Sequence, residues 1–277
     1  MKLRSLTTLA FCLVLSSVAI QAQEEKAGTD LEDARVATVA ARQDAVTNLL
    51  ASGDQSSGHG DYVEAARAWN RAGRFQLILN KPDEALATYH KALDVPRNTS
   101  DVQTRVDSLN GLASVYKHLT QLPEAKSLVE QAISLSDKNG YVEGKAEALL
   151  IRPFCISDNL EGLQNAEEAL ELWKSTNQKL GQAKAYLVVG EYQMIQNNLV
   201  ESTRNYKTAQ QLWQELNVPN QVAEALINLG FIEFRKGEWQ SSLSFYIQAQ
   251  QLIVDEAAEP YMMGQMEAGL AEAFIQT

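Results

Sequence analysis

The feature that most constrains this chain is a helical pattern of about 40 residues, which returns five times and begins a sixth time. An alanine marks the same place in each of the five copies. These alanines are Ala92, Ala132, Ala169, Ala209 and Ala249, with spacings of 40, 37, 40 and 40 residues. A single helix pair of this length cannot bury its apolar face alone, so such pairs stack on one another. The pattern predicts an all-α solenoid of stacked antiparallel helix pairs.

Small and aromatic residues alternate between the two helices of each predicted pair. The first helix carries a small residue after an apolar one at Gly73, Ala113, Gly190 and Gly230. The second helix carries Ala85-x3-Tyr89-x2-Ala92, Ser202-x3-Tyr206-x2-Ala209 and Ser242-x3-Tyr246-x2-Ala249, while Ala125-x3-Val129-x2-Ala132 keeps the sizes without the ring. Because helices approach closely only where small residues face a large one, we expect the rings to fill the space beside the small residues.

These positions resemble the tetratricopeptide repeat (TPR) family, whose pattern runs W-x2-L-G-x2-Y in the first helix and A-x3-F in the second. Trp69-x2-Ala72-Gly73 and Leu109-x2-Leu112-Ala113-x2-Tyr116 match the first half, and Gly237-Glu238-Trp239 is similar to the family's turn between helices. HEAT-type repeats share the period, but they do not require the small-aromatic-small signature. The resemblance covers roughly residues 61–277 and implies a right-handed TPR-like α-solenoid.

Prolines punctuate the pattern, with one exception. Pro82 and Pro123 stand where second helices are expected to begin, and Pro96, Pro219 and Pro260 stand in the expected links between pairs. Pro153 instead falls in the middle of a first helix, in the short third repeat, so Ile151 to Asn159 is predicted to be a broken or shortened helix. Two explanations stay open: a bend at which the groove changes shape, or a decayed repeat tolerated because its neighbours pack across it.

The N-terminus indicates export. Lys2 and Arg4 precede an apolar stretch that ends in small residues, which is the layout of a signal peptide over residues 1–22, cleaved after Ala22 or Ala19. An uncleaved N-terminal membrane anchor is the alternative. Lipidation at Cys12 is not expected, and no later stretch approaches the roughly 18 apolar residues that a membrane span requires. The sequence therefore predicts a secreted or periplasmic protein.

Three regions are expected. Residues 1–22 are the signal peptide, residues 23–60 hold a capping helix (Leu31 to Ala51) and a flexible loop (Asp54 to Gly60), and residues 61–277 hold the solenoid. The solenoid comprises five helix pairs and the first helix of a sixth, Tyr261 to Thr277. That last helix is apolar on more than one side, with Met262, Met263, Met266, Leu270, Phe274 and Ile275. This favours the N-terminal part of a longer protein.

Charge and reactive residues exclude several function classes. Cleavage after residue 22 leaves 22 Lys and Arg against 35 Asp and Glu, a net charge of −13, which argues against binding nucleic acid. The charge suits a basic partner, although a solvated acidic surface is the simpler explanation. Cys155 is expected to be a buried structural cysteine, and His59, His90 and His118 are too scattered for a metal set. No phosphate-binding glycine loop or nucleophile elbow is present, so we expect no enzymatic activity, cofactor or metal.

The TPR resemblance implies that first helices line a concave groove and second helices the convex side. The groove candidates are Asn70, Arg74, Asn110, Ser114, Lys117, Leu187, Glu191, Met194, Ile227, Asn228, Phe231, Phe234 and Arg235. Long-period TPR proteins such as kinesin light chain use asparagines to bind a ligand backbone, which the resemblance implies for Asn70 and Asn110. Alanine at both positions is then expected to abolish partner capture with little change in melting. The lysines of the clamp in chaperone-tail-binding TPR domains are missing here. For each candidate, a polar residue facing solvent is the alternative.

Two functions are compatible with these features. The first is an exported, non-enzymatic scaffold that binds protein or peptide partners in the groove. The second is the sensory or regulatory N-terminal arm of a larger protein, because exported TPR chains with this period resemble the N-terminal regions of CHAT-domain proteins and some sensor kinases. In that case any catalytic part lies beyond Thr277. Neither the ligand nor the oligomeric state follows from the sequence.

Overall fold

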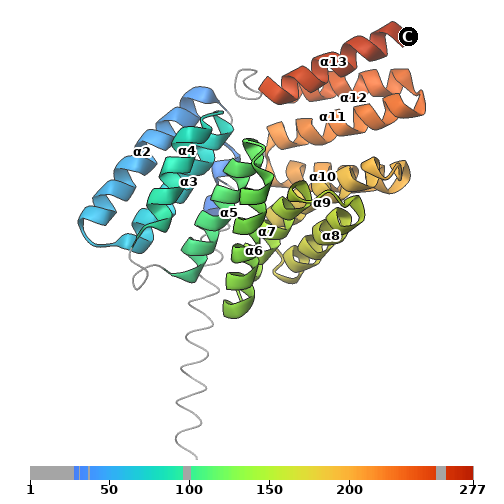
Figure 1. Cartoon of the computed structure of the whole chain (residues 1–277). Helices are drawn as coiled ribbons and strands as arrows, with labels where there is room; N and C mark the ends of the chain where they lie inside the picture. Colours follow the sequence, from blue (N-terminus) through green and yellow to red (C-terminus); the bar gives the residue numbers. More distant parts are fainter. Residues whose placement is uncertain (1–27, 31, 37, 96–100, 254–259, 277) are drawn as a thin grey trace, which may run out of the picture. The chain divides into compact units, whose positions relative to one another are not determined.

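A computed structural model describes residues 28–30, 32–36, 38–95, 101–253 and 260–276, and all regular structure in this part of the chain is helical (Figure 1). The chain divides into two compact units, residues 1–36 and 37–277. In the first unit, residues 28–30 and 32–34 are helical and a turn follows at Arg35. The expected signal peptide, residues 1–22, lies outside the described residues.

The second unit is a series of helix pairs. It opens with α2 (Val39–Gly58), followed by α3 (Tyr62–Ile78) with α4 (Pro82–Leu93), α5 (Val102–His118) with α6 (Leu122–Asn139), α7 (Val142–Ile151) with α8 (Asn159–Ser175), α9 (Lys179–Ile195) with α10 (Leu199–Leu216), and α11 (Pro219–Lys236) with α12 (Trp239–Leu252). The last helix, α13 (Pro260–Gln276), packs on both α11 and α12. From α2 to α13, each α-helix packs on the next one. The predicted all-α solenoid of stacked helix pairs is confirmed.

Tyrosine rings of the second helices fill the space beside glycines, as the sequence predicts. A Cβ atom added at the glycine would lie 2.8 Å from the ring for Gly73 and Tyr89, 3.0 Å for Gly190 and Tyr206, and 3.0 Å for Gly230 and Tyr246. Two rings also reach the following first helix. A Cβ atom at Gly111 would lie 2.1 Å from Tyr89, and one at Gly269 would lie 2.3 Å from Tyr246. The same ring therefore closes a pair and joins it to its neighbour.

Prolines occupy helix starts more consistently than the sequence suggested. Pro82 and Pro123 lie in the first turns of α4 and α6, as expected. Pro219 and Pro260 were expected in links, but they are the first residues of α11 and α13. The first helical position suits proline, because its missing N–H has no partner there in any case. Pro96 lies outside the described residues.

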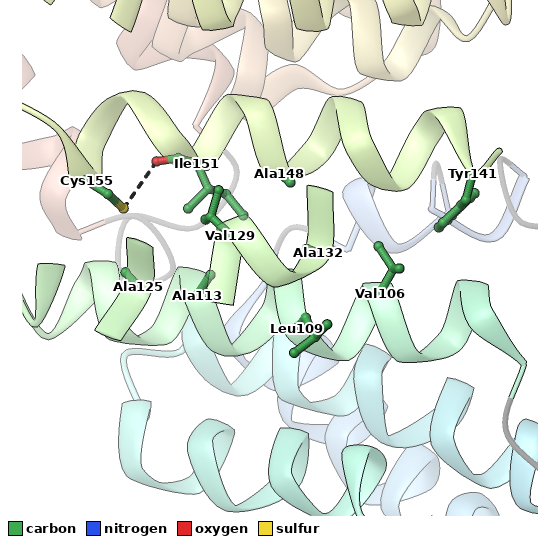
Figure 2. Close-up of a cluster of buried hydrophobic side chains, with 10 residues drawn as sticks. All are labelled: Val106, Leu109, Ala113, Ala125, Val129, Ala132, Tyr141, Ala148, Ile151 and Cys155. Atoms are coloured by element: carbon green, nitrogen blue, oxygen red, sulfur yellow. Dashed lines mark hydrogen bonds between the residues drawn. The ribbon is translucent and has the colours of Figure 1, made fainter. Parts of the chain in front are cut away.

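The third repeat contains the predicted break. Helix α7 ends at Ile151, and one turn of 3₁₀-helix, Arg152–Cys155, follows with Pro153 near its start. Figure 2 shows Cys155 at the end of a buried apolar cluster contributed by α5, α6 and α7, where its thiol donates to the Ile151 carbonyl at 3.6 Å. Burial raises the pKa of this thiol. The expectation of a buried structural cysteine is confirmed.

The broken segment is held firmly by its neighbours. The Arg152 guanidinium donates to Glu130 of α6 at 3.0 Å and to Asn165 of α8 at 2.9 Å, and it pairs with Glu161 of α8 at 3.2 Å. These bonds attach the 3₁₀ turn to the second helices on both sides. Pro153 itself is buried. The break is thus a defined part of the fold, with specific contacts of its own.

The predicted loop after the N-terminal helix is wrong. Helix α2 does not end at Ser52-Gly53 but continues to Gly58. Gly53 faces the Trp69 indole, since a Cβ atom there would lie 2.4 Å from the indole nitrogen. The next residue, Asp54, accepts a hydrogen bond from that nitrogen at 3.0 Å and pairs with Lys91. Glycine therefore marks a close approach between helices at this point and does not end the helix.

Some apolar residues of helix α13 are buried and others are exposed to solvent. Met262, Met263 and Met266 are buried, whereas Tyr261, Phe274 and Ile275 are 78%, 60% and 80% exposed. The expectation of an additional first helix with apolar residues on more than one side is confirmed. Among the described helices, none has the length and apolar character needed to cross a bilayer.

Candidate partner-binding face

The candidate residues lie at repeating positions of the first helices. Within each first helix, the positions six before, three before and one after the small residue form one stripe. We call the resulting surface the first-helix face: Arg67, Asn70 and Arg74; Asp107, Asn110 and Ser114; Glu147, Leu150 and Phe154; Lys184, Leu187 and Glu191; Glu224, Ile227 and Phe231; and, one turn further on, Lys117, Met194 and Phe234. Contacts between these positions on successive helices, described below, bring them together.

Asn70 and Asn110 join consecutive first helices. The Asn70 amide donates to the Thr104 carbonyl of α5 at 3.1 Å, and its oxygen accepts from the Ser108 hydroxyl at 2.8 Å. The Asn110 amide donates to the Gly144 carbonyl of α7 at 2.9 Å. Both asparagines are buried. Their amide donors are engaged inside the fold, so in this structure they are not free to hold a ligand backbone.

The equivalent positions of later repeats are apolar. Leu150 and Ile227 are buried, and Leu187 packs with Met194 on a cluster that includes Tyr206. The first-helix face therefore changes from amides that join helices near the N-terminus to apolar packing further along. Ser114 also bonds internally, because its hydroxyl donates to the Asn110 carbonyl at 3.0 Å.

Lys117 extends from α5 toward the third repeat. Its ammonium lies 4.4 Å from the centroid of the Phe154 ring, in the 3₁₀ turn that interrupts the first helix. Burial lowers the pKa of Lys117, and the carboxylates of Glu191, Glu147 and Glu224 act against this shift. Lys117 forms no salt bridge or hydrogen bond in the described part of the chain. The break at Pro153 thus places the Phe154 ring next to the half-buried ammonium of Lys117.

Glu191 on α9 is a half-buried carboxylate. It has no hydrogen bond or ion pair among the described residues. Burial raises the pKa of Glu191, and the positive charge of Lys117 opposes that effect. By contrast, Glu147 of α7 pairs with Lys184 of α9 at 3.2 Å. The first-helix face therefore holds the ion pair of Glu147 with Lys184. It also holds the opposite charges of Lys117 and Glu191, which form no salt bridge with each other.

Four candidates on α11 have different environments. Phe231 is 41% exposed, and Phe234 packs edge-on against Trp239 with ring centroids 4.9 Å apart. Arg235 donates to the Met194 carbonyl at 3.3 Å and to the Asn197 side chain at 2.9 Å, so it joins α11 to the preceding repeat. The remaining α11 candidate, Asn228, donates to the carbonyl of Glu224 at 3.0 Å within its own helix.

Arg74 completes the set on α3. It is half-buried, and its positive charge acts on the buried Tyr89 hydroxyl, together with Asp107 of α5. Asp107 also accepts a hydrogen bond from the Tyr141 hydroxyl at 3.0 Å. In the N-terminal part of the first-helix face, Arg74 thus opposes the effect of Asp107 and Glu147 on the pKa of Tyr89.

Sequence reasoning missed seven residues of the first-helix face: Arg67, Asp107, Glu147, Leu150, Phe154, Lys184 and Glu224. All seven stand at the repeating positions, so strict use of the repeat register would have found them. The third repeat hid three of them, because its first helix is broken at Pro153 and its spacing is three residues shorter.

The chemistry available at this surface is non-covalent recognition. Its side chains supply carboxylates, one ammonium over an aromatic ring and exposed apolar surface. Across the described residues, no three His, Cys, Asp or Glu side chains lie close enough together to hold a metal ion. Such a set of groups can bind a ligand by charge, hydrogen bonds and apolar contact.

Comparison with known proteins agrees with this geometry. A family profile described as tetratricopeptide repeat matches residues 66–99, which span most of α3 and all of α4. The family profile thus covers one helix pair of the chain, and the whole has a helical solenoid fold like that of tetratricopeptide-repeat proteins. A search of curated protein sequences finds no match.

Solved structures share the fold of this helical solenoid at low sequence identity. A Rap protein complexed with competence and sporulation factor has a TM-score of 0.68 and 18% identity, covering 84% of this chain and 68% of that chain. BtubC from P. vanneervenii has a TM-score of 0.59 and 16% identity, covering 78% and 91%. A STAND signal-transduction ATPase with a tetratricopeptide repeat sensor, from Pyrococcus horikoshii, has a TM-score of 0.58 and 12% identity, covering 78% and 36%. These likenesses establish the fold alone.

Proposed function

We propose that this protein is an exported, non-enzymatic TPR scaffold that binds a protein or peptide partner on its first-helix face. The fold is one that presents a repeated surface for recognition, and the Rap protein of the same fold was solved in complex with competence and sporulation factor. Nothing in its sequence or in the groups on this face calls for a cofactor, a metal or nucleic acid.

The observation that carries the proposal is the pair formed by Lys117 and Glu191. Both are half-buried on the first-helix face, and neither has a hydrogen bond or an ion-pair partner among the described residues. Partly burying a charge without a partner costs stability. Their opposite signs and the exposed Phe231 nearby on α11 suit a peptide, whose main chain offers both donors and acceptors.

A selection experiment tests this function. Random peptides displayed on phage would be selected on the full chain, and the enriched peptides would be measured against two variants, Phe231→Ala and Ile247→Ala. The two side chains are matched, since Phe231 is 41% exposed on α11 and Ile247 is 40% exposed on the second helix α12. We expect Phe231→Ala to weaken binding by about tenfold, the size of one good apolar contact, and Ile247→Ala to change nothing. Equal binding to both variants would contradict the proposal.

Export is tested separately by mass. If residues 1–22 are removed, the intact mass of the native protein in the exported fraction falls from 30.6 kDa by roughly 2.4 kDa. A mass equal to that of the whole chain in the membrane fraction would instead favour the uncleaved N-terminal anchor.

A second candidate function is a regulatory arm of a larger protein. The observation that favours it is the likeness to the STAND ATPase with a tetratricopeptide repeat sensor, of which the matched part is only 36%. A native mass far above 30.6 kDa in the same experiment would favour this function, and catalysis would then be sought beyond residue 277.

A further inference from the structure

Helix α13 carries the two most exposed large apolar side chains among the described residues. Ile275 is 80% exposed and Tyr261 is 78% exposed. They stand 14 residues apart, close to four helical turns, so they lie on the same side of the helix. The Tyr261 hydroxyl accepts a hydrogen bond from Gln265 of α13 at 3.0 Å. That bond stays within the helix, so the ring of Tyr261 remains on the surface.

The residues between these two side chains are small. Gly264, Ala268 and Ala271 are all exposed, and their spacing puts them on the side of Tyr261 and Ile275. The opposite side of α13 holds the buried methionines, and the helix packs on α11 and α12. The exposed side is therefore a shallow apolar surface with one bulky residue at each end.

The repeat register shows that this side of a first helix is normally covered. Its small residue is buried in α3, α5, α9 and α11, at Gly73, Ala113, Gly190 and Gly230. At the three glycines, the tyrosine ring of the following second helix packs against it. Ala271 holds the same place in α13 and is exposed. The stacking interface thus continues to α13, where no described helix covers the next side.

A second copy of α13 is complementary to this surface. In a two-fold symmetric interface, the same patch of both copies meets. If the two helices run antiparallel about Ala268, Tyr261 of each copy lies opposite Ile275 of the other. The small residues then lie between these contacts and let the helices approach closely.

The charges of α13 favour the antiparallel arrangement. Glu267 and Glu272 are its only charged residues. In the antiparallel pair, Glu272 lies opposite Gly264 of the second copy. In a parallel pair, each of these carboxylates would lie opposite its own copy, and like charges at such positions destabilise a contact. The antiparallel pair also sets the two helix dipoles in opposite directions.

We propose that the protein forms a two-fold symmetric dimer through α13, with the two helices antiparallel about Ala268. The contact uses no residue of the first-helix face on α3 to α11. The dimer therefore stands or falls independently of the proposed peptide binding. One helix from each copy makes a small interface, so we expect a dissociation constant of about 10 µM.

The test measures the mass of the full chain in solution by light scattering on a sizing column, at loads from about 1 to about 100 µM. The site variant is Tyr261→Ser with Ile275→Ser. Its matched control is Leu160→Ser with Val200→Ser, which removes apolar side chains of α8 and α10 that are 59% and 75% exposed. Circular dichroism melts show whether each variant is folded.

We expect the parent to pass from a mass near 30.6 kDa to twice that mass as its concentration rises. The site variant should raise the dissociation constant at least about tenfold, and the control should leave it unchanged. A parent that stays monomeric at every load would overturn the inference and leave this surface to a different partner. Equal weakening of the dimer by both variants would also overturn it.

Disulfide cross-linking tests the arrangement without removing the apolar contacts. Ala268→Cys should link two copies under mild oxidation, because Ala268 meets its own copy at the symmetry axis. Glu272→Cys is the control, since it lies about 12 Å from its own copy in the antiparallel pair. Both variants also carry Cys12→Ser, and Cys155 is buried. Links in both variants would indicate a parallel pair, and links in neither would exclude the contact, so either result would contradict the inference.

Discussion

Two sections of this solenoid share a backbone register but differ in how their polar groups are used. Between α3 and α5, the asparagine amide bonds the next helix, and the positive charge of Arg74 acts against the carboxylates of Asp107 and Glu147 on the pKa of the tyrosine. Between α9 and α11, an apolar residue replaces the asparagine, and only the carboxylates of Glu191 and Glu224 act beside burial on the pKa of the tyrosine. The residues compared are Asn70, Arg74, Asp107 and Tyr89 in the first section, and Leu187, Glu191, Glu224 and Tyr206 in the second.

The difference indicates that polar side chains have different roles in the two sections. In the first section, side-chain bonds run from one first helix to the next and stabilise the stack. In the second section, the tyrosine ring still packs, but its hydroxyl and Glu191 are left without hydrogen bonds in the described structure. A repeat fold can keep its geometry through small and aromatic residues while the remaining positions vary for binding.

The largest effect is expected from the asparagines. Alanine at both Asn70 and Asn110 should lower the free energy of unfolding by roughly 2–5 kcal/mol, because buried hydrogen bonds to the next helix are lost. Urea unfolding followed by circular dichroism measures this change. The result differs from the expectation based on sequence alone, in which melting is nearly unchanged. A midpoint equal to that of the parent would show that these bonds do not hold the stack.

The next largest change in stability is expected when one glycine of each section is replaced by alanine. Gly111→Ala should destabilise by about 1–3 kcal/mol, because the new Cβ atom would lie 2.1 Å from the buried Tyr89 ring. In Gly190→Ala the new Cβ atom would lie 3.0 Å from the Tyr206 ring, so small shifts relieve the contact. The higher helix propensity of alanine also offsets about 1 kcal/mol of the cost in stability.

The two glycine variants are compared by the same urea unfolding experiment. A larger loss of unfolding free energy for Gly190→Ala than for Gly111→Ala would contradict this expectation. It would mean that the distance between glycine and tyrosine ring does not control the stability of the helix pairs.

These residues also show what the sequence could predict. The five pairs, the pairing of Tyr89 with Gly73 and the break after Ile151 followed from spacing and size, because both are local properties of the chain. The position of the first-helix face followed from the same register.

Contacts between repeats did not follow from the sequence. A stripe at helical spacing tells which side chains share a face, but not how closely the next helix approaches it. Asn70 lies where that approach is within hydrogen-bond distance, so its amide is buried. Gly53 suggested a helix end, whereas the Trp69 ring packed against it explains why glycine is needed. Whether the buried Tyr206 hydroxyl finds a hydrogen-bond partner likewise depends on which side chains of α11 lie beside it.

A smaller effect concerns Glu191. Because burial raises its pKa, the native state favours the protonated form more than the unfolded state does, so ionised Glu191 costs stability at neutral pH. Glu191→Gln should raise stability at pH 7 by about 0.5 kcal/mol, the usual size for a residue outside the core. The gain should vanish as pH falls through the raised pKa of Glu191.

The titratable groups that interact electrostatically with Glu191 are Lys117 of α5, Tyr206 of α10 and Tyr192 of α9 itself. Thermal melts of the parent and the variant over a pH series measure the difference. A loss of stability at pH 7 would show that the attraction of Lys117 outweighs the effect of burial.

The smallest effect is expected from Tyr206→Phe. The substitution removes a hydroxyl that has no hydrogen bond in the described structure, so stability should change by about 0.5 kcal/mol or less. Urea unfolding gives the value. A loss above about 1 kcal/mol would reveal a structural hydrogen bond at this hydroxyl.

The central claim is that the section between α9 and α11 binds the partner. It is tested most directly by photo-cross-linking, with a peptide enriched in the phage selection in which one residue is replaced by a photoreactive analogue. Mass spectrometry of the digested product then locates the bond. The account predicts cross-links within residues 187–194 and 224–231. Cross-links concentrated on α3 and α5, or on the second helices, would contradict it.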